Sequence, residues 1–417
     1  MSNLSFVEKL LDGVEVEWKA LGEVGEFIRG NGLQKKDFIE TGFPAIHYGQ
    51  IYTKYGLSAD ETFTYVSEEL AKKLRKAIRN DLLLATTSEN DEDVVKPLAW
   101  LGRQAAISGD MMLFRHEQNV KYLAHYFLTE AFQAQKRKYI SGAKVRRVSS
   151  GDLAKVIVPI PCPDNPKKSL EIQAEIVRIL DAFTAMTTEL TTELNLRKKQ
   201  YNHYRDQLLS FEEGEVEWKT LGWIGEVRMC KRIMKNQTLD AGDIPFFKIG
   251  TFGKEPNSYI SREIFEEYRD KYNYPNVGEV LISASGTIGR AVIFDGKDAY
   301  FQDSNIVWLE NDESKVLNKF LFYFYQIANW NVSDGGVIKR LYNDNIKKTS
   351  IPIPYPNDPE KSLAEQARIV AILDKFDALT SSITEGLPRE IELRQKQYEY
   401  YRDLLLSFPQ PDTEVAA

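Results

Sequence analysis

The chain has 417 residues, enough for two or three domains, and 43% of them are hydrophobic, which is typical of packed cores. A net charge of −7 argues against a uniformly basic nucleic-acid-binding surface. Two cysteines (Cys162, Cys230) and four histidines (His47, His116, His125, His203) are scattered, and no apolar run approaches the roughly 18 residues of a membrane span. We expect a soluble cytoplasmic protein with reduced thiols and without a bound metal.

Two copies of one sequence plan fill the chain. Glu15-Val-Glu-Trp-Lys-Ala-Leu-Gly22 recurs as Glu215-Val-Glu-Trp-Lys-Thr-Leu-Gly222. Val158-Pro-Ile-Pro-Cys-Pro163 recurs as Ile351-Pro-Ile-Pro-Tyr-Pro356. Between these motifs lie bodies that share a pattern but little sequence. A duplicated frame with two different inserts predicts one scaffold that presents two different surfaces.

Each body is expected to be a small mixed α+β domain. In the first, residues 81–88 and 107–115 are predicted strands and residues 122–134 a helix. The second body is expected to contain two strands within 278–294, a strand at 301–308 and a helix at 319–330. Ser285-Gly-Thr-Ile-Gly289 is the expected turn between the first two of these strands.

A long helix is predicted after each proline-rich exit. From Ser169 to Phe211, apolar residues alternate in steps of three and four, which is a heptad seam. Pro163 and Pro166 should stop the helix upstream, and about 43 residues would make a rod of roughly 64 Å. The second copy keeps the seam from Ile369 to Ile383, and Pro388 should kink it.

The two long helices are expected to pair with each other in antiparallel orientation inside one chain, although pairing with a second chain remains the alternative. Within the first helix, Thr187-Thr-Glu-Leu190 is followed directly by Thr191-Thr-Glu-Leu194. Such a tandem tetrapeptide suggests an element that sets length, because one copy adds about 6 Å of helix. Low complexity in a helix explains the repeat equally well.

Basic residues are concentrated in two short runs, one near the end of the first body and one near the start of the second. Residues 133–151 contain six basic residues and no acid, and residues 227–239 contain four and no acid. Ser141-Gly-Ala-Lys-Val-Arg-Arg147 aligns with Asp334-Gly-Gly-Val-Ile-Lys-Arg340. Glycines allow close approach to phosphate, and paired cations can contact phosphates and guanine edges. The predicted DNA-contact residues are Lys35, Lys36, Lys144, Arg146, Arg147, Lys231, Arg232, Arg290, Lys339 and Arg340. A basic turn with a purely structural role is the alternative.

The combination of these motifs resembles the specificity subunits of type I restriction–modification systems. The resemblance rests on the paired Glu-Val-Glu-Trp-Lys motifs, on the Ser-Gly-Thr-Ile-Gly loop, and on Gln173-Ala-Glu-Ile-Val-Arg-Ile-Leu-Asp181 with its repeat at 366–374. It covers nearly the whole chain. It implies two target-recognition domains that each read one half of a split asymmetric DNA site, on helices that set the spacer.

The resemblance also implies partners. Two methyltransferase subunits would dock on the helices, and restriction subunits with translocase and nuclease activity would join them. S-adenosylmethionine, ATP and Mg would be used by those partners, with no cofactor in this chain. The predicted spacer and docking residues are Ile176, Leu180, Phe183, Leu190, Leu194, Tyr201, Leu208, Ile369, Leu373, Phe376, Tyr398 and Leu405.

The resulting domain plan has five parts. An N-terminal helix at 1–12 would complete the scaffold and give a circular arrangement. Target-recognition domains are expected at 13–157 and 214–350, a central helical spacer at 158–213, and a C-terminal helical spacer and tail at 351–417. The expected fold class is α+β, with two mixed α/β domains separated by an antiparallel intramolecular coiled coil and related by a pseudo-twofold repeat.

The sequence lacks the motifs that would indicate catalysis by the chain itself. No phosphate-binding Gly-x-x-x-x-Gly-Lys-[Ser/Thr] loop occurs, and no adenine-methyltransferase motif is visible. Glu17-Trp-Lys19 and Glu217-Trp-Lys219 imitate a nuclease Glu-x-Lys, but no further acids converge on them, which favours a structural role. A stand-alone nuclease or methyltransferase is therefore disfavoured. A coiled-coil adaptor that binds only protein is the second alternative.

Overall fold

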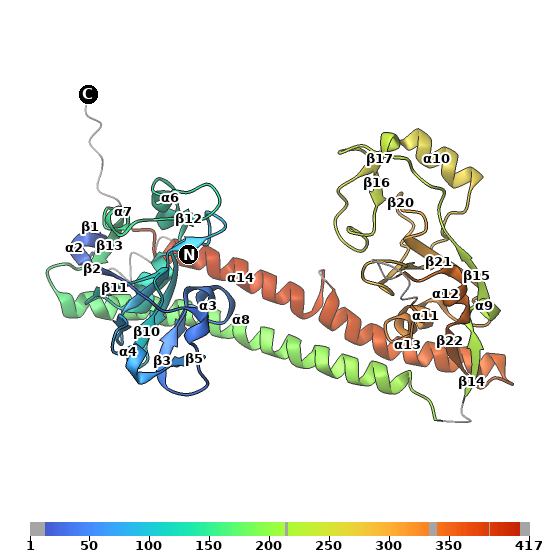
Figure 1. Cartoon of the computed structure of the whole chain (residues 1–417), viewed down its shortest axis with the longest axis horizontal. Coiled ribbons are helices and arrows are strands. Elements are labelled where there is room, and N and C mark those ends of the chain that lie inside the picture. The colour runs from blue at the N-terminus through green and yellow to red at the C-terminus, as the bar shows by residue number, and fades with distance from the viewer. Residues whose placement is uncertain (1–12, 213–215, 333–339, 383, 409–417) are drawn as a thin grey trace. The chain divides into compact units, whose positions relative to one another are not determined.

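The computed structural model describes residues 13–212, 216–332, 340–382 and 384–408. The chain divides into two compact units: unit 1 is Met1–Thr191 with Glu390–Ala417, and unit 2 is Thr192–Arg389. Each unit contains a mixed α/β body and long helices (Figure 1): α8 (Pro166–Leu208) runs through both units, α13 (Pro359–Ser381) belongs to unit 2, and most of α14 (Gly386–Leu405) belongs to unit 1. The expected α+β class is therefore confirmed, whereas the N-terminal helix expected at 1–12 lies outside the described residues.

The body of unit 1 is built on two sheets. One has the strand order β2 (Gly25–Arg29), β11 (Met111–His116), β7 (Leu82–Ala85), β9 (Lys96–Trp100), β4 (Ser58–Ala59). The other has the order β5 (Thr64–Val66), β3 (Phe43–Ile46), β10 (Ala105–Ile107), β6 (Lys76–Ala77). Its short helices are α2 (Leu21–Val24), η1 (Lys35–Asp37), α3 (Tyr48–Thr53), α4 (Glu68–Ala71), α5 (Val120–Tyr126), α6 (Glu130–Arg137) and α7 (Ser150–Leu153).

The body of unit 2 repeats this plan with fewer strands. One sheet has the order β15 (Gly225–Arg228), β21 (Ile306–Asn311), β18 (Val280–Ser283), β19 (Ala291–Ile293), and the other β17 (Tyr259–Ile260), β16 (Ile244–Phe247), β20 (Tyr300–Phe301). Its short helices are α9 (Leu221–Ile224), η2 (Lys235–Gln237), α10 (Arg262–Lys271), α11 (Asn318–Tyr325) and α12 (Asn343–Lys348). The smaller sheet of each body contains a parallel strand pair: β3 with β10 in unit 1, and β16 with β20 in unit 2.

The two repeated motifs of each copy pair with each other. Strand β1 (Val16–Ala20), from the opening motif, runs antiparallel to β13 (Ile157–Pro161), from the proline exit. The corresponding pair in unit 2 is β14 (Val216–Thr220) with β22 (Ser350–Pro354), and the register is the same. The beginning and end of each body are thereby joined before the chain enters the long helix.

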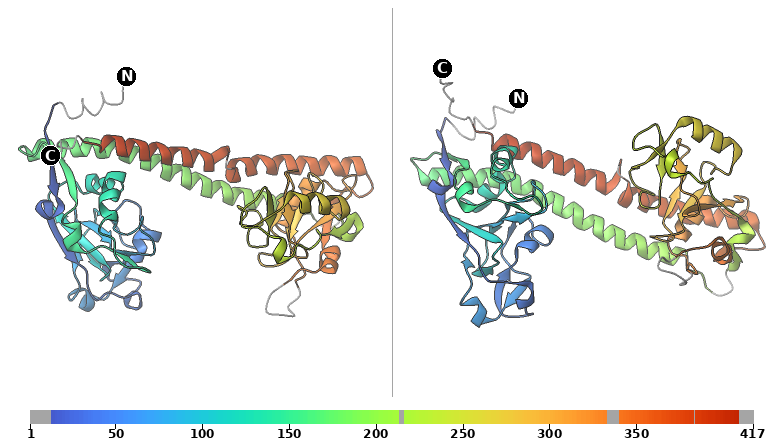
Figure 2. Two further views of the ribbon diagram at one scale, coloured as in Figure 1. Left: turned by 90° about the horizontal axis from the view of Figure 1, so that it is seen from above. Right: turned by 45° about the horizontal axis from the view of Figure 1, so that its top comes forward.

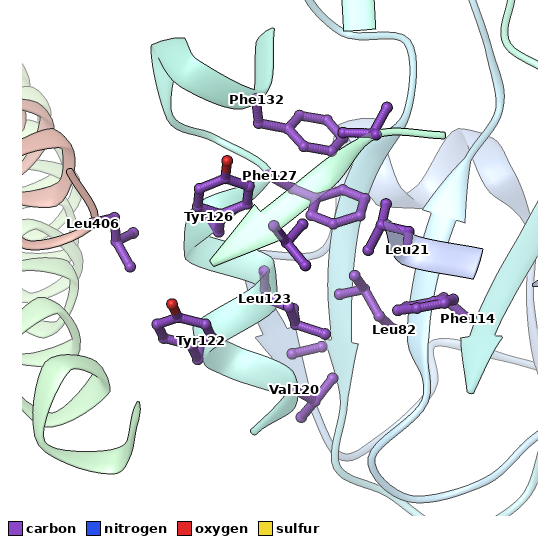
Figure 3. Packing of buried hydrophobic residues seen from close by; sticks show 14 of the residues in the cluster. Leu21, Leu82, Phe114, Val120, Tyr122, Leu123, Tyr126, Phe127, Phe132 and Leu406 are labelled. Carbon is purple, nitrogen blue, oxygen red and sulfur yellow. The ribbon is translucent and has the colours of Figure 1, made fainter. Parts of the chain in front are cut away.

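A hydrophobic core joins the body of unit 1 to its helices. Tyr122 and Leu123 of α5 belong to the same buried cluster as Ile176 and Leu180 of α8 and Leu405 of α14. Figure 3 shows Tyr122 and Tyr126 on the side of α5 that faces Leu406, with Leu82 and Phe114 of the sheet beyond. Unit 2 has a matching cluster that includes Phe320 of α11 with Ile369 and Leu373 of α13. Body and helix therefore share one core in each unit.

The long helices pair within the chain, as expected. In unit 1 the first part of α8 lies beside α14 (Figure 2), and the rings of Phe183 and Tyr401 stack at 5.2 Å between centroids. In unit 2 the last part of α8 packs on α13, where Tyr204 stacks on Phe376 at 5.5 Å. Residue numbers rise along α8 while those of its partners fall, so the pairing is antiparallel.

Helix boundaries differ from the sequence expectation at three places. Helix α8 begins at Pro166 rather than Ser169, because proline is tolerated in a first turn, where its missing N–H has no partner to lose. The second rod is interrupted rather than kinked: α13 ends at Ser381 and α14 begins at Gly386. A Cβ at Gly386, whose φ is +75°, would lie 2.4 Å from the Ala378 carbonyl oxygen, so the break depends on glycine.

The bodies also contain more breaks than the sequence suggested. The helix expected at 122–134 is two helices, α5 and α6, because the Thr129 hydroxyl accepts a hydrogen bond from the Phe132 amide and caps a new helix. The strand expected at 301–308 is divided into β20 and β21 by Ser304, whose φ is +54°. The strand expected at 107–115 is likewise divided between β10 and β11. The hairpin expected within 278–294 is confirmed as β18 and β19.

Two equivalent glycines, Gly25 and Gly225, lie where a larger side chain would collide with the backbone of a neighbouring strand. A Cβ at Gly25 would lie 2.2 Å from the Arg115 carbonyl oxygen, and one at Gly225 would lie 1.9 Å from that of Glu310. Either Gly25→Ala or Gly225→Ala should lower the free energy of unfolding by about 3 kcal/mol, since strand backbones must separate. Urea denaturation followed by tryptophan fluorescence measures this. Gly151→Ala, with no atom closer than 4.0 Å, is the matched control and should be neutral; equal effects would contradict the packing argument.

Candidate nucleic-acid interface

The two basic loops predicted to contact DNA end at equivalent positions in the two bodies. Arg147, in strand β12 (Arg146–Arg147), lies opposite Thr87 of β8 (Thr87–Ser88), two residues after β7. Arg340 forms an isolated antiparallel bridge with Ser285, two residues after β18. Strands β7 and β18 occupy corresponding positions in their sheets. The structure therefore brings each arginine beside the turn that follows the same strand.

Within the first loop, the side chains differ in how firmly they are held. The Arg146 guanidinium pairs with Asp91 at 2.8 Å and donates to the Gly142 carbonyl at 2.7 Å. Lys144 and Arg147 have exposed side chains, and neither forms a side-chain hydrogen bond or ion pair that we observe with another described residue. Arg147 and Lys144 are thus available to an external anion, whereas Arg146 would first have to release Asp91.

The second loop is organised by an amide. Arg340 is half-buried and donates through Nη2 to Asn305 Oδ1 at 3.1 Å, and the same oxygen accepts from the Ser285 hydroxyl at 2.8 Å. Asn305 lies between β20 and β21, and its contacts make it part of this site, although its residue type and place in the sequence did not predict this. Lys339, the other predicted contact residue of this loop, lies outside the described residues.

The Ser-Gly-Thr-Ile-Gly turn forms the β18–β19 hairpin loop (residues 284–290) beside Arg340. The Ser283 hydroxyl accepts from the Arg290 amide at 2.9 Å and donates to the Thr287 carbonyl. Gly289 has φ of +79°, and a Cβ there would lie 2.4 Å from the Trp330 indole nitrogen. The Arg290 side chain is also held, because its Nη1 donates a hydrogen bond to the Phe252 carbonyl at 2.9 Å. The turn is therefore a fixed element, and its glycines permit both the sharp reversal and the close contact with Trp330.

The corresponding loop in unit 1 has a different character. The β7–β9 hairpin loop (residues 86–95) carries Glu89, Asp91, Glu92 and Asp93. Lys136 of α6 is fully buried and donates to the carbonyl oxygens of Glu92 and Val94, both at 2.9 Å. Burial lowers the pKa of the Lys136 ammonium to about 8. Lys136 belongs to the basic run at 133–151, but its ammonium is buried and anchors the neighbouring loop.

The remaining predicted cations lie beside equivalent short helices. Lys35 and Lys36 are exposed in η1, and the equivalent helix η2 begins at Lys235. Lys231 stands 5.0 Å from the centroid of the Tyr272 ring, and Arg232 pairs with Asp303 at 2.8 Å. These residues precede η2 in unit 2, so they are not the equivalents of Lys35 and Lys36.

The predicted seam residues lie between helices or against a body. In unit 1, Ile176, Leu180, Tyr398 and Leu405 are buried, whereas Phe183 and Leu190 are half-buried. In unit 2, the buried members are Tyr201, Ile369 and Leu373, and the half-buried ones are Leu194, Leu208 and Phe376. Much of the seam is therefore internal packing.

No catalytic arrangement is found in the part of the chain that the structure describes. Glu17 pairs with Lys19 at 2.9 Å along β1, and Glu217 pairs with Lys219 along β14, so both Glu-x-Lys motifs are local ion pairs. No group of three or more His, Cys, Asp or Glu side chains could hold a metal ion among the described residues. No helix there has the length and apolarity that a membrane span requires.

Comparison with known proteins identifies the class. The sequence model of the family described as "Type I restriction modification DNA specificity domain" matches residues 13–197 and 213–393. The chain belongs to this family: it is a specificity subunit with two target-recognition domains and a non-catalytic component of its system.

Individual relatives agree with this assignment. The chain is 45% identical to a Haemophilus influenzae protein named as a type I restriction enzyme specificity subunit, over 98% of this chain and 99% of the relative. It is 38% identical to the EcoR124I/EcoR124II specificity subunit of Escherichia coli over 99% of both chains. The S subunit from M. genitalium shares the fold, with a TM-score of 0.52, 12% identity, and coverage of 96% of this chain and 98% of that one. DNA sequence recognition is therefore favoured over the protein-only adaptor.

The buried lysine generates a prediction for unit 1. Lys136→Met should lower the free energy of unfolding by about 2–3 kcal/mol, because two carbonyls lose charge-assisted hydrogen bonds. The difference in unfolding free energy between wild type and variant should widen as pH rises from about 8 toward 10. Over this range the folded wild type has released the Lys136 proton while the unfolded chain still holds it, so the wild type gains stability with pH and the variant does not. Urea denaturation at several pH values measures both effects. Lys138→Met, at an exposed neighbouring position, should show neither; equal loss in both variants would refute the anchoring role.

Proposed function

We propose that this chain reads a bipartite asymmetric DNA site, one half with each target-recognition domain, and that its helices fix the gap between the halves. The recognition domains are residues 13–157 and 214–350, and the helical spacers are 158–213 and 351–417. The observation that carries the proposal is the equivalence of Arg147 and Arg340 beside two hairpin loops of different chemistry. Equivalent placement supports a common way of binding the DNA backbone, and different loops support different base readout.

The same proposal assigns partners to the helices. Two methyltransferase subunits dock on the helical spacers, and restriction subunits join this assembly. The partners supply S-adenosylmethionine, ATP and Mg chemistry in the cytoplasm. Exposed side chains on the helix faces away from the seam, among them Leu196 and Leu393, support a docking role.

A map of N6-methyladenine tests the function directly. Cells that carry this chain with its neighbouring methyltransferase gene would be compared with cells that lack only the chain. One motif with two short half-sites and a fixed gap, present only with the chain, is the expected result. A contiguous motif, or no motif, would contradict the two-domain reading.

Charge reversal tests the two equivalent arginines. Arg147→Glu and Arg340→Glu should each weaken binding of the purified chain with its methyltransferase to target duplexes, and each should reduce the slope of log affinity against log salt by about one unit, because a phosphate contact is lost. Reversing Arg146 together with Arg147 should weaken binding further. Fluorescence anisotropy across a salt series measures both quantities.

The matched control is Arg368→Glu, which reverses a charge on α13 that pairs with Glu365 outside the recognition domains. Its affinity and salt slope should stay at wild-type values. If Arg147→Glu and Arg340→Glu also leave both quantities unchanged, the assignment of these arginines as phosphate contacts is wrong.

Deletion of Thr191–Leu194 tests the length-setting role of the tandem repeat. The helix is continuous here, with the Thr191 hydroxyl donating to the Thr187 carbonyl at 2.8 Å. Removing four residues shortens α8 by about 6 Å and rotates its end by only about 40°. The methylated motif should keep both half-sites with a gap roughly two base pairs shorter, at about 3.4 Å each. Replacing the same four residues with alanine preserves length and should preserve the gap; an unchanged gap in the deletion would refute the idea.

A further inference from the structure

In each unit one short helix, α5 or α11, meets its long helix through corresponding polar contacts. We call these contacts joint 1 and joint 2. Joint 1 consists of Lys121 and His125 of α5, Gln173 and Asp181 of α8, and Tyr398 of α14. Joint 2 consists of Lys319 and Tyr323 of α11 with Gln366 and Asp374 of α13. Each joint lies within one unit.

The glutamines hold the start of the short helices. Gln173 is fully buried, and its Oε1 accepts from the backbone amide of Asn119, the N-cap of α5, at 2.9 Å. Gln366 is also fully buried and accepts from the amide of Leu317, the N-cap of α11, at 2.9 Å. The Nε2 of each glutamine donates to a serine of its own helix, Ser169 or Ser362. Each glutamine side chain is therefore held through both its oxygen and its nitrogen. Its oxygen in turn holds the N-cap amide of the short helix.

The aspartates hold the same helices farther along. Lys121 Nζ pairs with Asp181 Oδ2 at 2.8 Å, and Lys319 Nζ pairs with Asp374 Oδ2 at 2.6 Å. The second carboxylate oxygen binds one turn onward, to His125 Nε2 at 3.4 Å in joint 1 and to the Tyr323 hydroxyl at 2.7 Å in joint 2. His125 also bonds Tyr398 of α14 at 2.9 Å. Burial lowers the pKa of His125, so this ring is held neutral.

These contacts are retained where the sequences around them differ. The short helices read Val-Lys-Tyr-Leu-Ala-His-Tyr in unit 1 and Asn-Lys-Phe-Leu-Phe-Tyr-Phe-Tyr in unit 2, and share the lysine in the second position. Each long helix places its glutamine and aspartate eight residues apart, about 12 Å along the axis. Apolar packing alone is non-directional and tolerates sliding, whereas two directional attachments about 12 Å apart fix both position and rotation.

We propose that Gln173 and the Lys121–Asp181 pair, with Gln366 and the Lys319–Asp374 pair, are positioning residues that set where each recognition domain sits along its helix and thereby restrict the chain to one spacer length. The inference rests on the proposed function, in which the gap between half-sites follows from the separation of the domains. A slip by one helical turn, about 5.4 Å, would shift a domain by roughly one and a half base pairs.

The test is spacer tolerance, because a side chain that only adds stability would not change it. Lys121→Glu places a carboxylate against Asp181 and should release the attachment while the shared apolar core remains. Methylation maps of cells carrying this variant should keep both half-site sequences and show at least about tenfold more methylation at gaps one base pair shorter or longer than the wild-type gap. Lys121→Glu with Asp181→Lys restores an opposite pair and should return methylation to the single gap.

Two further variants keep the test decisive. Arg178→Glu reverses an exposed cation three residues from Asp181 on the same helix, where Arg178 pairs with Glu175, and should leave the gap unchanged. Asp181→Asn keeps the shape without the charge and should broaden the gap to a smaller extent, even if Lys121→Glu fails to accumulate.

The outcomes separate this inference from the function on which it rests. A wild-type map without a bipartite motif would contradict the proposed function itself. A bipartite wild-type motif whose single gap persists in Lys121→Glu and Asp181→Asn, at full or reduced methylation, would overturn only the positioning role. Equal broadening by Arg178→Glu would also overturn it, because the effect would then follow from charge on α8 in general.

Discussion

The burial of one short helix between a sheet and a long helix is the constraint on which each unit depends. Tyr122 and Leu123 of α5 are fully buried, and they belong to the same cluster as Leu82 of the sheet and Leu180 of α8. Phe320 and Leu321 of α11 occupy the same place between β18 and α13. Separating a body from its helix would expose its own core, at roughly 25 cal/mol for each Å² of apolar surface. The long helix therefore completes the core of such a recognition domain, so the domain does not fold independently of that helix.

The distribution of charge explains how an acidic chain can read DNA. Candidate cations are accompanied by acids or amides, as Arg146 is by Asp91, Arg232 by Asp303 and Arg340 by Asn305. A DNA phosphate must displace these partners before it can bind the cation. A contact with the DNA backbone in poor geometry therefore gains little free energy. Exposed Lys144 and Arg147 have no such competitor among the contacts we observe. Restrained cations reduce nonspecific attraction, which depends on net positive charge, and leave specificity to the contacts made when both bodies fit.

Sequence reasoning predicted the features that depend on repetition and periodicity. The duplicated motifs, the mixed bodies, the β18–β19 hairpin and the antiparallel helix pair all follow from patterns that recur or alternate. It failed where one side chain ends an element: Thr129 begins a new helix, Ser304 divides a strand, and Gly386 separates α13 from α14. Burial of Lys136 was equally hidden, because a basic run gives no sign that one of its members turns inward to two carbonyl oxygens. Asp91 and Asn305 were missed because their partners lie far away in the sequence and come together only in the folded sheet.

The duplication also separates what is constant from what varies. Joint 1 and joint 2 retain a buried glutamine, a lysine and an aspartate, although His125 of one is Tyr323 of the other. The hairpin loops beside Arg147 and Arg340 correspond in their pairing at Thr87 and Ser285 but differ in chemistry. One carries four acids and is held by Lys136 at the Glu92 and Val94 carbonyl oxygens, and the other is a glycine turn packed against Trp330. Carboxylates and small polar groups present different acceptors and shapes to a groove. The constant part belongs to the attachment of each body to its helix and the variable part to a surface loop, so one repeated scaffold carries two recognition domains of different surface chemistry.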